Sequence, residues 1–185
     1  THVTEDGITG WGTIYGLIQG AQHEMGIETL VNNWGPTSQT DWTNQYANNF
    51  VEGYSHNVVY ILQGAFWCKG VTPGTFDGVV SSDLLSAIST LKTNAGLSDT
   101  SSTPDQYFMA ALLSMKQFVL LDEGDSGIQT IQKTLNHDYY SYLVNDSNVG
   151  ILATDGVFQR DSAAALIYAL QATEGLAVGT ANGVY

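Results

Sequence analysis

The sequence predicts an all-α protein built from tandem small three-helix modules packed end to end. Three observations predict this fold: a segment that occurs three times, helical spacing of the apolar residues in each copy, and the lack of a convincing strand pattern. The copies run from Asp6 to Ile27, from Asp77 to Leu97 and from Asp155 to Leu176. An ordered repeat of this kind is typical of chains that stack one supersecondary unit on the next.

Each copy carries one amphipathic helix. Apolar residues recur at spacings of three and four, as in Ile14, Leu17, Ile18 and Ala21 of the first copy. The helices are expected to begin at polar capping residues, which are Thr13, Ser82 or Asp83, and Asp161 or Ser162. They are expected to end at a glycine followed by an apolar residue, at Gly26, Gly96 and Gly175.

A second helical signature precedes the second and third copies, with a glutamine directly after an apolar residue, as in Leu62-Gln63 and Ile131-Gln132. A further helix is expected from Thr103-Pro104 and carries Phe108, Leu112 and Met115. The pattern divides the chain into a partial first module, a second module and a C-terminally incomplete third module, at residues 1–50, 51–122 and 123–185.

An Asp-Gly pair opens every copy. Glycine tolerates positive φ, and aspartate can accept a hydrogen bond from its own backbone two residues on. This turn chemistry favours a structural role for Asp77 and Asp155. Ligand binding stays open as the alternative, because the turn sits beside the mouth between two helices in all three copies.

The composition excludes several classes of partner. The 185 residues are 43% hydrophobic and include 18 acidic against 5 basic residues, for a formal net charge of −13. Without a basic cluster, nucleic acid and anionic membrane surfaces are not expected partners. No apolar run is long enough to insert into a membrane. The polar but uncharged surface suits a secreted or cell-wall-associated protein, whereas the lone Cys68 fits either redox compartment.

The residues do not favour catalysis or metal binding. A glycosidase needs two carboxylates across a cleft, and the candidates are Glu5, Asp6, Glu24, Glu28, Asp77 and Asp155. Three of these occupy the repeated turn and are better explained as scaffold. The histidines are scattered, without HExxH or CxxC spacing. We therefore expect no catalytic residue, no metal and no cofactor.

Aromatic residues make the stronger case for a site, because sugar rings stack on exposed aromatic faces beside polar groups that fix their hydroxyls. Trp67, Lys69 and Asp77 are the predicted ligand-binding residues of the second module. Tyr140, Asp155 and Arg160 are those of the third module, and Trp11 and Trp34 lie around the first turn. Core packing is the alternative for each ring.

The motifs resemble tandem peptidoglycan-binding-like modules, which are small three-helix cell-wall-binding domains. The similarity lies in the apolar-Gln helix, the Asp-Gly turn and the helix that closes in Gly-Leu, as in Glu174-Gly175-Leu176. Trp34-Gly35-Pro36-Thr37 looks like the tail that commonly follows such a module. The sequence around Trp11 and Tyr168 looks most like that of multi-repeat Gram-positive surface or lytic proteins that also carry a glycoside-hydrolase-like domain.

The resemblance implies a non-catalytic module that binds peptidoglycan or another cell-wall glycan and targets a cell-wall hydrolase. If the chain is part of an enzyme, the resemblance implies a glycoside hydrolase whose catalytic domain is not in this chain. The alternative is a self-associating structural unit of an extracellular assembly, in which the partner is a homo-oligomer. The abundant Tyr and Trp and the low content of charged residues fit this alternative as well.

Overall fold

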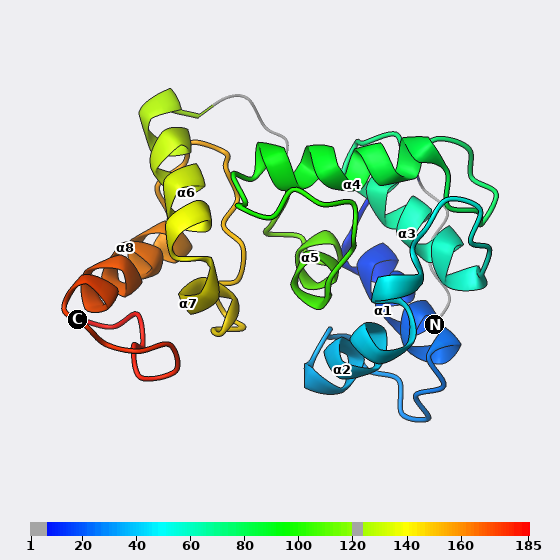
Figure 1. The fold of residues 1–185 in the computed structure, drawn as a ribbon, viewed down its shortest axis with the longest axis horizontal. Coiled ribbons are helices and arrows are strands. Elements are labelled where there is room, and N and C mark those ends of the chain that lie inside the picture. Colours follow the sequence, from blue (N-terminus) through cyan, green and yellow to red (C-terminus); the bar gives the residue numbers. More distant parts are fainter. Residues whose placement is uncertain (1–6, 120–123) are drawn as a thin grey trace. The chain divides into compact units, whose positions relative to one another are not determined.

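The structure is a computed structural model that describes residues 7–119 and 124–185 (Figure 1). Its helices are α1 (Trp11–Glu24), α2 (Pro36–Gln45), the 3-10 helix η1 (Ala47–Asn49), α3 (Asn57–Cys68), α4 (Ser82–Asn94), α5 (Gln106–Leu112), α6 (Ser126–Asp138), α7 (Tyr140–Val144) and α8 (Arg160–Thr173). The all-α prediction is confirmed, since these residues form no strand. Among the described residues, one isolated antiparallel bridge between Ser55 and Val79 lies beside the Asp77-Gly78 turn.

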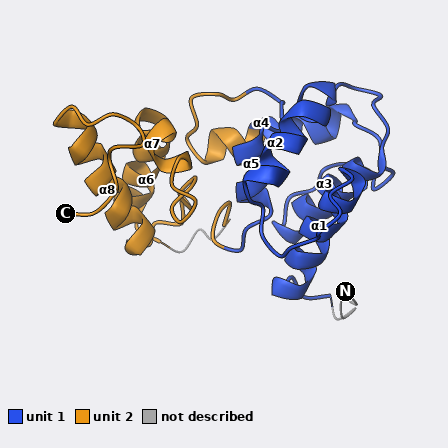
Figure 2. Ribbon diagram, turned by 90° about the horizontal axis from the view of Figure 1, so that it is seen from below, with its two compact units in different colours: residues 1–89, 101–115 blue, residues 90–100, 116–185 orange. Residues whose placement is uncertain are grey.

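The chain divides into two compact units (Figure 2). Unit 1 holds the described residues up to Ser89 together with Ser101–Met115, and unit 2 holds Thr90–Thr100 and the described residues from Lys116 to Tyr185. Each unit is a part of the chain whose residues contact mainly one another. The three modules inferred from the repeat stay a prediction.

The core of unit 1 forms where α1 packs against α3 and α2 against α5. A Cβ atom on Gly20 would lie 3.4 Å from Ile61 Cδ1, and one on Gly64 would lie 3.5 Å from Leu17 Cδ2. These two contacts show that α1 and α3 run antiparallel, with glycines allowing close approach. Trp42 of α2 is fully buried, and its Nε1 donates to the carbonyl of Pro104 at 2.6 Å.

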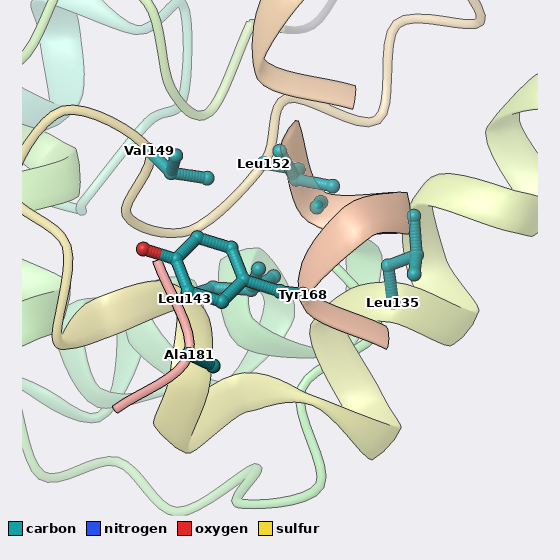
Figure 3. Packing of buried hydrophobic residues seen from close by; sticks show 7 residues of the cluster. Leu135, Leu143, Val149, Leu152, Tyr168 and Ala181 are labelled. Atoms are coloured by element: carbon teal, nitrogen blue, oxygen red, sulfur yellow. The ribbon is translucent and has the colours of Figure 1, made fainter. Parts of the chain in front are cut away.

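Unit 2 is built on α6, α7 and α8, which contact one another. Its apolar cluster is visible in Figure 3 and comprises Leu135, Leu143, Val149, Leu152, Ala165, Tyr168 and Ala181. Asn136 of α6 is buried within unit 2, where its Nδ2 donates to the carbonyls of Ala95 and Leu152 and its Oδ1 accepts from Leu152 N. Because the buried Asn136 amide makes all three bonds, it fixes the loops at Ala95 and at Leu152 against α6.

The predicted glycine caps are confirmed. Gly26, Gly96 and Gly175 have φ of 76°, 76° and 90°, a region that glycine occupies without a steric penalty. The following apolar residue donates back into the last turn each time, as in Ile27 N to the carbonyl of Gln22 and Leu176 N to that of Gln171. These are the bonds of a Schellman cap.

Some helix starts differ from prediction. Helix α4 begins at Ser82 as expected, and Ser81 Oγ accepts from Leu84 N. Helices α1 and α8 begin earlier, after Gly10 and Gln159, with no side-chain cap.

The helix expected from Thr103-Pro104 begins at Gln106 instead and ends before Met115. Asp105 Oδ1 caps it by accepting from Tyr107 N and Phe108 N. The Pro104 carbonyl is taken by Trp42.

Candidate functional site

The Asp77-Gly78 turn is held by one buried side chain, Gln63 of α3. Gln63 Nε2 donates to the Thr75 carbonyl at 2.8 Å, to Asp77 Oδ1 at 3.2 Å and to the Val79 carbonyl at 3.2 Å. Gln63 Oε1 accepts from Gly78 N at 3.0 Å. We refer to this arrangement as a glutamine clamp. It joins the apolar-Gln helix and the Asp-Gly turn, two motifs that the sequence presents separately.

Unit 2 repeats the clamp with Gln132 of α6. Its Nε2 donates to Asp155 Oδ1 and to the Val157 carbonyl, both at 3.1 Å, and its Oε1 accepts from Gly156 N at 2.9 Å. A further bond reaches Ser162 Oγ of α8 at 3.2 Å. The clamp therefore ties α6 both to the turn and to α8.

Two more glutamines, on α1 and α8, bind the backbone of the loop that follows their own helix. Gln22 of α1 accepts from Val31 N and donates to the Asn33 carbonyl. Gln171 of α8 accepts from the backbone of Asn182 and Gly183 and donates to the Val184 carbonyl. The sequence signal was present, because Gln22 and Gln171 align in the repeat, but their function as clamps was missed.

The carboxylates of Asp77 and Asp155 thus stabilise the turns in which they lie. Each carboxylate accepts from the backbone N–H two residues on, at Val79 and Val157. The bond from Val79 N and the one from Gln63 hold the pKa of Asp77 below its usual value, so this exposed carboxyl stays ionised at neutral pH. An ionised oxygen at the surface can also accept from a ligand hydroxyl or amide.

Exposed aromatic rings lie on α3 and next to the same turn. Tyr60 and Trp67 of α3 are 41% and 52% exposed, and Phe76, directly before Asp77, is 57% exposed. The rings of Tyr60 and Phe76 meet edge to face, with centroids 5.2 Å apart. We call Tyr60, Trp67 and Phe76 the aromatic platform. The sequence analysis identified only Trp67, although a spacing of seven in a helix places Tyr60 on the same face.

The backbone is shaped to carry this platform. A Cβ atom on Gly78 would lie only 2.2 Å from Tyr60 Cε2, so the Tyr60 ring rests directly on that glycine. Tyr60 and Trp67 are two helical turns apart, about 10 Å along α3. Between them Gly64 leaves room for Leu17 and Phe76. Tyr60 and Phe76 thus pack together at the Asp77-Gly78 turn, and Trp67 is exposed further along α3.

Lys69 turns to a different part of unit 1. Its Nζ donates to the carbonyl of Ser114, and burial lowers the pKa of Lys69 to about 8. The carboxylate of Asp77 accepts from Gln63 and Val79. Of the predicted group, Trp67 and Asp77 are exposed, whereas Lys69 is half-buried.

Trp11 and Trp34, the two tryptophans predicted around the first turn, differ in exposure. Trp11 begins α1, is exposed and packs its ring on Tyr15 at 5.7 Å between centroids. Because α1 and α3 are antiparallel, Trp11 and Trp67 lie at the same end of this helix pair. Trp34 is buried instead, with its ring edge-on to Trp42 and its Nε1 donating to the Gln106 carbonyl at 3.3 Å.

The residues predicted for the third module are spread over three elements. Asp155 is held in the turn, Arg160 is the exposed first residue of α8, and Tyr140 is the half-buried first residue of α7. Val157 and Phe158 follow Asp155 and are both exposed. The turn of unit 2 thus also carries an exposed ring beside its carboxylate, which the sequence analysis did not single out.

The structure also bears on catalysis and metal binding. Glu5 and Asp6 lie outside the described residues. Of the remaining glycosidase candidates, Asp77 and Asp155 serve their turns. Within the described ranges, no group of three or more His, Cys, Asp or Glu side chains is placed to hold a metal ion. None of the helices described is both long and apolar enough to cross a membrane.

The geometry is that of an all-α protein in which glutamine clamps fix two Asp-Gly turns with exposed rings next to them. A family model described as the FadG/YbfG PGDB-like domain matches residues 121–185, the part that contains α6, α7 and α8.

Two curated proteins of Bacillus subtilis (strain 168) are similar over nearly the whole chain. The uncharacterized protein YbfG is 40% identical over 183 residues, and the uncharacterized protein FadG is 34% identical over 181 residues. The chain spans 24% of the length of YbfG and 31% of that of FadG. No solved structure matches the chain.

Proposed function

We propose that this chain is a non-catalytic module that binds peptidoglycan or a related cell-wall glycan and positions an attached activity there. The aromatic platform is the observation that carries the proposal. Three exposed rings, two of which lie at the turn of an ionised carboxylate, offer stacking surfaces for sugar faces and an acceptor for their hydroxyl and amide groups.

The family match supports this proposal. We take "PGDB-like" to refer to peptidoglycan binding, and the matched residues include the turn at Asp155 with its exposed Phe158. A chain bearing two such turns would bind a repetitive polymer more tightly than one turn alone, since the second contact forms at high effective concentration. The proposed location is outside the cell or at the cell wall.

The net charge sharpens the proposal. At −13 the chain is repelled by anionic wall polymers, whereas the aromatic platform needs no opposite charge on its ligand. We therefore expect tighter binding to peptidoglycan stripped of its anionic polymers than to the whole wall. The difference between the two should shrink in high salt, which screens repulsion between exposed charges.

The test is co-sedimentation with purified peptidoglycan for the unaltered protein and for Trp67→Ala, Phe76→Ala and the double variant. Each lost ring should weaken binding by about 1 kcal/mol, roughly fivefold, and leave thermal stability nearly unchanged. Tyr185→Ala is the matched control, because Tyr185 is a fully exposed ring outside the platform. Absence of sedimentation, or equal binding by all variants, would overturn the proposal.

A self-associating structural unit is the second candidate function. The exposed leucines Leu166 and Leu170 on one side of α8 favour it. Light scattering over a wide concentration range tests this alternative: a stable monomer that still sediments with peptidoglycan would contradict it.

A further inference from the structure

Helix α8 carries an apolar stripe that the described structure leaves partly exposed. The stripe consists of Ala163, Leu166, Ile167 and Leu170, with Leu166 and Leu170 41% and 47% exposed. From the internal repeat we infer that this stripe is a docking surface for the α2–α3 segment of a further copy of the repeat. The inference concerns how repeats join and does not rest on glycan binding.

The equivalence of α1 and α8 identifies the occupant. The two repeat copies align without a gap, so Leu17 corresponds to Leu166, Ile18 to Ile167 and Gln22 to Gln171. Both helices have 14 residues and close with the same Schellman bond, from Ile27 N and from Leu176 N.

Most of the equivalent stripe is buried in α1, where Leu17 is the one half-buried residue of the four. Ile14, Ile18 and Ala21 are 1%, 3% and 0% exposed. Helix α3 contacts this stripe at Leu17, which lies beside Gly64, and contacts α1 next to the stripe at Gly20, which lies beside Ile61. Helix α2 and the residue that follows it hold the end of α1: Ser38 accepts from Gln22, and the Tyr46 hydroxyl donates to the Glu24 carbonyl.

The turn after each helix is equivalent as well. Gln22 clamps residues 31–33 and Gln171 clamps residues 182–184, which brings Tyr185 to the position of Trp34. Trp34 is buried against Trp42 of α2, whereas Tyr185 is fully exposed. The stripe, the clamped turn and the following ring of α8 thus reproduce the surface that α1 presents to the α2–α3 segment.

The occupant must match an uncharged apolar surface. An α2–α3 segment supplies a tryptophan at the position of Trp42 and a glycine at that of Gly64, both of which the equivalent contact uses. YbfG and FadG are longer than the region they share with this chain, so proteins of this similarity have the length to carry another copy.

The test extends the full chain, so that residues 1–185 are followed directly by a second copy of residues 35–115. The extended protein is tested with its α8 stripe unaltered, and a second version carries Ala163→Ile and Leu170→Ala, which give the stripe the residues of α1. In the extended protein we expect the added segment to fold, and hydrogen exchange of the backbone amides of Leu166 and Ile167 to slow at least tenfold.

Leu166→Asp provides the disrupting variant. It should shift the melting temperature of the unextended protein by no more than a few degrees, and should unfold the added segment in the extended one. Arg160→Glu is the matched control, because Arg160 is exposed and its counterpart Trp11 in α1 is exposed too. This control should have no effect in either protein.

Three results would overturn the inference. The added segment could remain unfolded, or fold without protecting the stripe. Alternatively, the unextended protein could protect the stripe as its concentration rises, which would make the occupant a whole second chain. None of these readouts uses peptidoglycan, so the result is independent of the proposed glycan binding.

Discussion

Helices α1 and α8 have the same repeat pattern but bury different sides. In α1 the buried side chains are Ile14, Ile18, Ala21 and Gln22. In α8 they are Ser162, Ala165 and Tyr168, whose counterparts in α1 are only half-buried. Helix α8 packs against α6 and α7, which precede it in the chain, whereas α1 packs against α3, which follows it. Local sequence therefore sets the helix, its cap and its clamp, and the neighbours decide which face enters a core.

The largest expected difference between the two regions concerns the aromatic residue after each clamped turn. Trp34→Ala should destabilise the protein by about 4 kcal/mol, because it removes a buried indole and its hydrogen bond. Tyr185→Ala at the equivalent place should cost less than about 0.5 kcal/mol. Urea unfolding measures both losses of stability, and a small loss for Trp34→Ala would show that this ring is not part of the core.

The apolar stripes should differ next. Ile18→Ala deletes a buried side chain and should cost about 3 kcal/mol, whereas Ile167→Ala, at a half-buried position, should cost about 1 kcal/mol. Thermal unfolding followed by circular dichroism compares the two variants. Equal losses would mean that the α8 stripe is as well packed as that of α1.

The glutamine clamps should show a smaller contrast of the same kind. Gln22→Leu leaves the Val31 N–H and the Asn33 carbonyl without their partner near a core and should cost about 2 kcal/mol. Gln171→Leu should cost about 1 kcal/mol, since its bonds lie closer to solvent and water can replace them. Denaturant titration of both variants gives the comparison. A larger loss for Gln171→Leu would contradict it.

The smallest predicted effect belongs to Lys69 of unit 1. Because the pKa of Lys69 falls to about 8 on folding from its usual value near 10.5, the unfolded chain binds more protons between these values. Stability should therefore rise from pH 8 toward pH 10, by about 1 kcal/mol after allowance for solvent screening. Unfolding of Lys69→Met across this range is the control, and it should lack the rise.

Above pH 10 the tyrosines act in the opposite direction. Burial raises the pKa of Tyr46, Tyr54 and Tyr168, so the folded protein holds these protons more tightly than the unfolded chain and stability falls as the pH rises further. The Lys69 effect is therefore measured between pH 8 and pH 10 as the difference between the two proteins.

Much of the fold could be predicted from the sequence. Helical periodicity and the glycines at 26, 96 and 175 are local signals, and the structure contains the helices and caps that they predict. The start of α5 was misplaced because Asp105 competes with Thr103 as a cap, and the choice depends on Trp42, which takes the Pro104 carbonyl.

The candidate site was less accessible to prediction. The structural role of Asp77 follows from turn chemistry, yet its partner Gln63 is 14 residues away and only the folded loop brings them together. The separation of Trp11 from Trp34 into an exposed and a buried ring also depends on tertiary packing. Composition alone gives no indication of which aromatic residues reach solvent.

The most direct test of the account compares thiol labelling at equivalent positions of α1 and α8. Single cysteines are introduced as Ala21→Cys and Leu170→Cys in a Cys68→Ser background, because residues 21 and 170 align and their exposed fractions are 0% and 47%. The account predicts that position 170 reacts at least a hundredfold faster than position 21 under native conditions. Equal rates at the two positions would contradict it, since they would show that the repeat itself, and not its neighbours, decides which face is buried.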